Sequence, residues 1–286
     1  MEFKAYKMDG LGNDFVIIET KKRNPISISK EKIIELGKRD NIGFDQMIFV
    51  EEDGVISNHA SIKIFNSDGD EVDACGNGSR CVAKIICDKK KTEAAVIETS
   101  NRILKAQKIS DNSIRLAMGE PIFDWKKIPL SENIDHKKIN LNIDGIELKE
   151  GFALNVGNPH IVFFVENCFK YDLKKIGPLI ENHKLFPEKI NVTFAEKKDS
   201  TNILVNVWER GAGLTKACGT AACATGVVAF EKNLTEKSTN IHFKEGFLNI
   251  EYDVGISMTG PVSDIKEIKF KLNDGVTPHI NKHAFE

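Results

Sequence analysis

The chain has 286 residues, which is long for one hydrophobic core and favours two domains. Hydrophobic residues make up 41% and charged residues 29%, as in globular proteins, and a net charge of −2 creates no field for nucleic acid or an anionic membrane. No apolar run reaches the roughly 18 residues that span a bilayer, and the first residues, MEFKAYKMDG, lack the apolar core of a signal peptide. We therefore expect a cytoplasmic protein that binds neither nucleic acid nor membrane.

The predicted elements are mostly short strands, with few helices. Period-two alternation of apolar and polar residues predicts the strands, and apolar residues spaced three and four apart after a capping residue predict the helices. In chain order they are a helix at 29–39, a strand at 61–65, a helix at 172–183, and strands at 202–208 and 265–272. Gly and Pro in MGEP, 118–121, and in MTGPV, 258–262, mark the places where the chain would pass between domains.

Three pairs of matched segments occur in the same order and at nearly constant separation. Cys75 and Cys218, in DACGNGSRC and KACGTAACAT, lie 218 − 75 = 143 residues apart. NSDG from Asn66 corresponds to ERGAG from Glu209, again 143 residues later, and GNDFVII from residue 12 corresponds to GNPHIVFF from residue 157. Self-similarity of this kind indicates an internal duplication.

The duplication predicts the architecture. We expect an α+β fold of two pseudo-symmetric domains, each a curved mixed or antiparallel sheet that closes around a central helix. The first domain would comprise residues 1–118 with 263–286, and the second residues 119–262. The active site would lie in the cleft between the two domains.

Each cysteine motif places a thiol directly before the start of a predicted helix. There Cys75 and Cys218 would face the positive end of the helix dipole and backbone N–H groups without intrahelical partners. Both influences favour the thiolate, so we expect the thiol pKa to fall from about 8.5 toward neutrality. The glycines that follow let the backbone approach a ligand closely, and the same N–H groups suit a carboxylate.

Two such thiols on opposite faces of one carbon would perform a two-base racemisation. One thiolate would remove the α-proton while the opposite thiol delivered a proton to the other face. We expect no cofactor, because no phosphate cradle for pyridoxal phosphate is present, and no metal, because the cysteine spacings match no zinc pattern. The remaining cysteines are expected to be buried structural thiols: Cys81, Cys87, Cys168 and Cys223.

The chain resembles the diaminopimelate epimerases, cofactor-independent enzymes that interconvert LL- and meso-diaminopimelate for lysine and peptidoglycan synthesis. The resemblance covers nearly the whole chain. The segments that carry it are GLGNDF (10–15), FDQ (44–46), NSDG with CGNGSRC (66–81), GNPH (157–160), FPEKINV (186–192), ERGAG (209–213) and ACGTAACA (217–224).

The resemblance implies a role for each matching residue. Cys75 and Cys218 would be the acid–base pair, with His160 and Glu209 tuning the thiols. Diaminopimelate would be the small-molecule partner, and a homodimer is the implied assembly. The substrate contacts it implies are Asn13, Gln46, Asn66, Gly76, Asn77, Asn158, Asn191, Glu209, Arg210, Gly219 and Thr220. Amides and arginine suit the ammonium and carboxylate groups of an amino acid.

Three residues depart from the family pattern. Asp9 stands where many relatives have histidine, Asp70 replaces a serine, and Leu214 replaces the glutamate of GAGET. Only Leu214 puts in doubt the support of the second cysteine loop.

The sequence is also compatible with three other functions. A histidine or proline racemase on the same scaffold would keep both cysteines. A thiol redox protein would form a disulfide between Cys75 and Cys218 during its working cycle. A non-enzymatic amino-acid-binding protein would tolerate serine at both positions.

Overall fold

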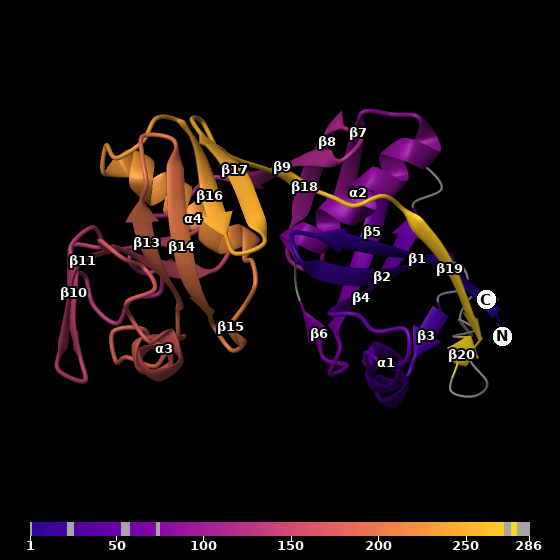
Figure 1. Cartoon of the computed structure of the whole chain (residues 1–286), viewed down its shortest axis with the longest axis horizontal. Coiled ribbons are helices and arrows are strands. Elements are labelled where there is room, and N and C mark those ends of the chain that lie inside the picture. The colour runs from indigo at the N-terminus through magenta and orange to yellow at the C-terminus, as the bar shows by residue number, and fades with distance from the viewer. Residues whose placement is uncertain (1, 22–25, 53–57, 73–74, 272–275, 279–286) are drawn as a thin grey trace, which may run out of the picture. The chain divides into compact units, whose positions relative to one another are not determined.

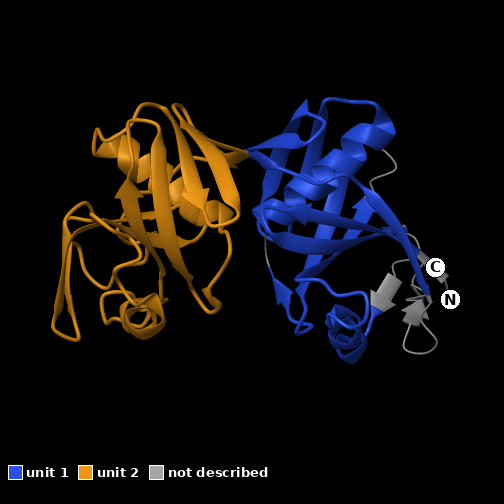
Figure 2. Ribbon diagram, in the orientation of Figure 1, with its two compact units in different colours: residues 1–116, 260–286 blue, residues 117–259 orange. Residues whose placement is uncertain are grey.

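The chain forms two compact units (Figure 2). The computed structural model of the chain describes residues 2–21, 26–52, 58–72, 75–271 and 276–278. Unit 1 comprises residues 1–116 with 260–286, and unit 2 comprises residues 117–259. These boundaries lie two and three residues before the expected 118 and 262. Residues 272–275 and 279–286 of the expected first domain lie outside the described residues.

In its described residues, unit 1 contains two helices, a mixed sheet and a separate two-stranded sheet (Figure 1). Its helices are α1 (Lys30–Gly37) and α2 (Gly76–Lys90). Its strands are β1 (Glu2–Gly10), β2 (Asn13–Lys21), β3 (Ile26–Ile28), β4 (Gln46–Glu52), β5 (His59–Asn66), β6 (Glu71–Val72), β7 (Ala94–Glu98), β8 (Ile103–Ser110), β19 (Lys266–Lys271) and β20 (Val276–Pro278).

Unit 2 repeats this plan with its own two helices (Figure 1). The helices are α3 (Leu173–Glu181) and α4 (Gly219–Glu231). The strands are β10 (Ile139–Ile143), β11 (Ile146–Asn155), β12 (Pro159–Phe164), β13 (Asn191–Lys197), β14 (Asn202–Glu209), β15 (Gly213–Leu214), β16 (Ser238–Phe243) and β17 (Gly246–Tyr252). The chain enters unit 2 within β9 (Ser113–Gly119) and leaves it within β18 (Ile256–Pro261), and β9 pairs with β18.

The order and direction of strand pairing are the same in both units. In unit 1, β1 and β2 are antiparallel, β2 and β4 parallel, β4 and β5 antiparallel, β5 and β7 parallel, and β7 and β8 antiparallel. In unit 2 the same series runs through β11, β12, β13, β14, β16 and β17. The predicted α+β fold with an internal duplication is therefore confirmed.

One helix in each unit is enclosed by the strands of its own sheet. Helix α2 contacts β1, β2, β4, β7 and β8, and α4 contacts β11, β12, β13, β16 and β17. Helix α4 is buried without interruption from Ala221 to Ala229, as expected of a helix that is apolar on all sides. At Gly226 a side chain would collide with Ile250 of β17 at 2.6 Å, so glycine permits this close packing. Enclosure fixes the position of each helix start relative to its sheet.

The two outer helices begin where the capping residues predict. The Ser29 hydroxyl accepts a hydrogen bond from Lys32 N at 3.3 Å, and the Asp172 carboxylate accepts one from Lys174 N at 3.1 Å. Both helices end before the expected residues 39 and 183. None of the helices in the described ranges combines the length and apolar composition needed to cross a membrane.

Candidate active site

The residues expected at the active site are distributed over both units. Unit 1 contains Asn13, Gln46, Asn66, Cys75, Gly76 and Asn77, and unit 2 contains Asn158, His160, Asn191, Glu209, Arg210, Cys218, Gly219 and Thr220. Within each unit, the local structure shows what holds these side chains and which of their polar atoms are already occupied.

The two cysteines have the same local geometry. Cys75 is the N-cap of α2, and its Sγ accepts a hydrogen bond from Gly78 N at 3.4 Å. Cys218 is the N-cap of α4, and its Sγ accepts one from Ala221 N, also at 3.4 Å. The N–H groups that precede these two donors belong to the first helical turn, which has no intrahelical acceptor for them. They are the N–H groups of Gly76, Asn77, Gly219 and Thr220.

The expected lowering of the thiol pKa is wrong for Cys218. Burial raises the pKa of this thiol well above its ordinary value, and the Glu209 carboxylate raises it further. Hydrogen bonds from Thr220 and Ala221 act in the opposite direction but do not compensate. Cys218 is 6% exposed, so the loss of hydration outweighs the helix dipole. Cys218 therefore holds its proton at neutral pH.

The Glu209 carboxylate is placed beside Cys218 by a tight hairpin between β14 and β15. Its Oε1 accepts a hydrogen bond from the Thr215 hydroxyl, and the Cys218 thiol is a second hydrogen-bonding partner. Burial raises the pKa of Glu209, while these two hydrogen bonds lower it. Leu214 pairs with Trp208 through the backbone, and its side chain is 42% exposed. Thr215 supports the loop through its hydrogen bond to Glu209, and the exposed Leu214 side chain takes no part in that bond.

His160 is a fully buried, neutral histidine on β12. Burial, with a smaller contribution from Arg210, lowers its pKa to about 3. Its Nε2 lies 2.8 Å from the Asn158 Oδ1, so Nε2 carries the hydrogen and donates it. Its Nδ1 has no hydrogen-bond partner among the described residues. The buried ring thus presents an unoccupied acceptor atom.

Asn191 joins two of the motif segments to each other. Its Oδ1 accepts a hydrogen bond from Arg210 N, and its Nδ2 donates one to Pro159 O, both at 2.8 Å. The guanidinium of Arg210 donates to Glu188 O at 3.1 Å. Asn191 is 2% exposed and uses both ends of its amide within unit 2. Asn191 therefore holds the backbones of Pro159 and Arg210 in position, and its contact with the substrate stays a prediction.

Three of the expected amides lie at one end of the unit 1 sheet. Asn13 and Gln46 begin the parallel strands β2 and β4, and Asn66 ends β5 directly opposite Gln46. The Gln46 Nε2 donates to the Asn66 Oδ1 at 2.9 Å, while the buried Gln46 Oε1 has no hydrogen-bond partner within the described ranges. A side chain at Gly10, which pairs with Asn13, would lie 3.3 Å from Asn77 O. The start of α2 is therefore at the same end.

An ion-pair network that the sequence analysis missed supports these amides. Asp14 and Asp45 follow Asn13 and precede Gln46, and each accepts the other's backbone N–H at 3.1 Å. The Arg39 guanidinium donates to both oxygens of Asp14, at 2.9 and 2.8 Å, and to Asp45. Burial alone would raise the pKa of Asp14, but hydrogen bonds from Lys7 and Arg39 lower it to about 2. The aspartates in the GNDF and FDQ segments were the sequence signal from which this network could have been predicted.

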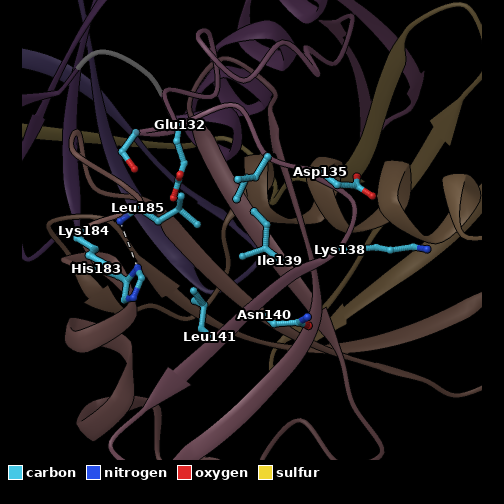
Figure 3. Close-up of a pocket in the computed structure, with 11 residues that line it drawn as sticks. Glu132, Asp135, Lys138, Ile139, Asn140, Leu141, His183, Lys184 and Leu185 are labelled. Carbon is cyan, nitrogen blue, oxygen red and sulfur yellow. Dashed lines mark hydrogen bonds between the residues drawn. The ribbon is translucent and has the colours of Figure 1, made fainter.

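A separate cavity in unit 2 contains none of the expected site residues (Figure 3). It has a volume of about 510 Å³ and is lined by Ser131, Glu132, Ile134, Asp135, Lys138, Ile139, Asn140, Leu141, His183, Lys184 and Leu185. In Figure 3 the charged ends of Glu132, Asp135 and Lys138 do not converge on one point. Within the described part of the chain, no group of three or more His, Cys, Asp or Glu side chains is arranged to hold a metal ion.

Comparison with known proteins identifies the family. The family profile described as "Diaminopimelate epimerase" matches residues 5–123 and 152–265, which include every expected site residue. The chain belongs to the diaminopimelate epimerase family. The resemblance read from the sequence motifs is thereby confirmed.

Several relatives in this family are similar over nearly their full length. A diaminopimelate epimerase of Pelagibacter ubique (strain HTCC1062) is 48% identical over 277 residues, which cover 95% of this chain and 100% of that protein. A diaminopimelate epimerase of Wolbachia sp. subsp. Drosophila simulans (strain wRi) is 40% identical over 258 residues, covering 90% and 95%.

Solved structures of more distant proteins share the fold. A phenazine biosynthesis protein of the PhzF family from Enterococcus faecalis superimposes with a TM-score of 0.63 at 14% identity, covering 95% of this chain and 100% of that chain. A hydroxyproline epimerase from Agrobacterium vitis gives a TM-score of 0.62 at 12% identity, covering 96% and 93%. At these identities the likeness supports the duplicated fold of the family and no particular substrate.

Proposed function

We propose that the chain interconverts LL- and meso-diaminopimelate by exchanging the proton on one α-carbon. Family membership makes it an isomerase, and the 48% identical relative carries the name of this activity. The observation that supports the mechanism is the matched pair of N-cap cysteines. Cys75 and Cys218 begin the enclosed helices of the two duplicated units, and each Sγ accepts the N–H of the third residue beyond it at 3.4 Å.

The proposed reaction uses one cysteine as base and the other as acid. Removal of the α-proton by the Cys75 thiolate breaks the Cα–H bond and leaves its electron pair on the substrate. Delivery of the Cys218 proton to the opposite face forms the new Cα–H bond and leaves Cys218 as thiolate. The raised pKa of Cys218 supports its starting role as the proton donor. The reverse reaction exchanges these roles, so no atom is gained or lost.

Charge that develops on the reacting carboxylate would be stabilised by the two helix starts. The backbone N–H groups of Gly76 and Asn77 in unit 1, and of Gly219 and Thr220 in unit 2, are the donors we assign to it. No electron-sink cofactor is needed in this scheme, because these N–H groups and the helix dipoles stabilise the negative charge that develops when the α-proton leaves.

Recognition of the second amino acid head is assigned to the amides and arginine. We assign recognition of a substrate ammonium group to the Gln46 Oε1, which has no hydrogen-bond partner among the described residues, together with Asn66 and Asn13. A substrate carboxylate fits the guanidinium of Arg210.

The location and assembly of the protein are parts of the same proposal. We assign it to the cytoplasm, where the six free cysteines would stay reduced, and we propose a homodimer. Sedimentation at several protein concentrations tests the assembly.

Isotope exchange tests the proposed activity. Reduced protein is incubated with LL-diaminopimelate in deuterated water without added cofactor, and α-deuterium is followed by NMR. L-histidine and L-proline are run in parallel. We expect deuterium in diaminopimelate as meso product forms, and no turnover by Cys75→Ala or Cys218→Ala. Incorporation of deuterium only into histidine or proline would overturn the assignment of diaminopimelate as the substrate. Full turnover by either cysteine variant would overturn the two-base mechanism.

A further inference from the structure

A buried carboxylate at the end of α3 contacts the loop that carries Glu209 and Arg210. Glu181 is 5% exposed, and its two oxygens have different partners. The Oε2 accepts a hydrogen bond from the Trp208 indole Nε1 at 2.7 Å, and the Oε1 accepts one from Gly211 N at 2.9 Å. The two donors lie on either side of Glu209 and Arg210 in the chain.

Close packing keeps Glu181 in this place. It lies on the buried face of α3 with Ile176, Gly177 and Ile180. A side chain at Gly177 would lie 2.5 Å from the Trp208 indole, so the ring rests directly on the helix backbone. The acidic residue in an otherwise apolar stripe is the sequence signal for a buried, paired carboxylate.

The hairpin that Glu181 contacts is short and has few conformations available. Gly211 and Gly213 have φ values of +77° and +83°, which favour glycine, and Ala212 N donates to Glu209 O at 3.1 Å. Asn191 Oδ1 accepts a hydrogen bond from the backbone N–H of Arg210 at 2.8 Å. Together these contacts determine where the Glu209 carboxylate and the Arg210 guanidinium point.

We propose that Glu181 is a positioning residue, which fixes the hairpin so that Glu209 meets Cys218 and Arg210 meets the substrate. This inference rests on the proposed function and adds a residue to it. Glu181 acts only through the hairpin, because both of its oxygens are already bound to Trp208 and Gly211. A carboxylate is required, since a carboxamide offers one acceptor oxygen to two N–H donors.

The first test compares Glu181→Gln with a matched control. Glu196→Gln changes another carboxylate of unit 2, which accepts Cys168 N at 3.3 Å and lies outside the hairpin. We expect Glu181→Gln to lower kcat/KM by about tenfold to a hundredfold, as small displacements of catalytic groups do, and to shift the pH profile. Glu196→Gln should change neither. A loss by Glu181→Gln of less than twofold, or an equal loss by Glu196→Gln, would overturn the proposal.

A rescue experiment separates positioning from general destabilisation. In the double variant Glu181→Gln/Trp208→Phe the indole donor is absent, so the Gln oxygen is available to Gly211 N–H. We expect this variant to recover at least threefold of the lost kcat/KM when compared at equal folded fraction. Failure to recover any activity would refute the assigned geometry.

Amide hydrogen exchange at Gly211 reports on the hairpin without reference to activity. We expect the Gly211 N–H to exchange slowly in the wild-type chain, at least tenfold faster in Glu181→Gln, and slowly again in the double variant. Unchanged exchange would overturn the proposal. A wild-type chain without epimerase activity would overturn the proposed function instead, and exchange at Gly211 would still decide whether Glu181 holds the hairpin.

Discussion

The buried histidine predicts a specific acid sensitivity of unit 2. The pKa of His160 is lowered from 6.5 to about 3 in the folded chain, with burial as the main cause. Between these values the unfolded chain binds a proton at this residue and the folded chain does not. The free energy of unfolding therefore falls as the pH falls from 6.5 toward 3. Stability from this residue is fully present above pH 6.5.

The size of the effect follows from the shift. A difference of 6.5 − 3 = 3.5 pH units corresponds to about 5 kcal/mol over the whole range. Between pH 7 and pH 5 the contribution is about 2 kcal/mol. His136 and His183 add to the slope in the same direction, because burial lowers their pKa values as well. Only a variant at residue 160 removes the His160 contribution.

Urea unfolding of His160→Gln isolates this contribution. The Gln side chain retains an N–H donor for Asn158 but does not titrate. The two tryptophans, Trp125 and Trp208, both lie in unit 2, so their fluorescence reports the unfolding of the unit that contains His160. We expect the wild-type chain to lose about 2 kcal/mol more than the variant between pH 7 and pH 5.

A second histidine variant provides the control. His242→Gln, on β16 of the same unit, leaves His160 in place and should keep the contribution of residue 160 to the pH dependence. Equal slopes for the wild-type chain and His160→Gln would refute the reasoning, because the buried ring would then titrate alike in the folded and unfolded chains.

Three further variants test other parts of the structure. Arg39→Gln removes the cation that bridges the two aspartates, and we expect KM for diaminopimelate to rise about tenfold with little change in kcat; a fall in kcat alone would contradict this. Gly177→Ala places a methyl group against the Trp208 ring, so urea unfolding should show a free energy of unfolding that is lower by roughly 1 to 3 kcal/mol. A higher free energy of unfolding would show that the ring moves aside without cost. Thr215→Val removes a hydrogen bond that lowers the pKa of Glu209, so the acid limb of the pH–rate profile should move to higher pH. An acid limb at unchanged pH would show that the ionisation of Glu209 does not control the rate.

The fold could be predicted from the sequence because the two halves share short motifs that lie at nearly the same separation along the chain. The two cysteine phrases, 143 residues apart, occur at the starts of α2 and α4, and the two GN phrases lead into β2 and β12. Local capping signals located α1 and α3 for a similar reason, since an N-cap depends on residues adjacent in the chain. Features with a local cause were therefore accessible.

What the sequence did not reveal depends on contacts between distant residues. Arg39 meets Asp14 and Asp45 only when β2 and β4 pair, and the sequence does not show which cation reaches them. Glu181 lies 27 residues from Trp208 and 30 from Gly211. The error for Cys218 has the same origin, because the helix dipole is a local property but burial is set by the whole unit.

The pairing of β1 with β19 affects the order in which the units are completed during synthesis. Residues 2–7 of β1 pair with residues 266–271 of β19, whereas unit 2 consists of one continuous segment, 117–259. Unit 2 is therefore fully synthesised before β19 exists, so all of its strands are available for folding before unit 1 is complete. About 260 further residues must be synthesised before this edge of β1 can pair with β19, which takes roughly 13 to 52 s at the usual speed of translation. An unpaired strand edge exposes backbone N–H and C=O groups that can pair with another chain. We therefore expect the nascent chain to be most prone to aggregation in this interval.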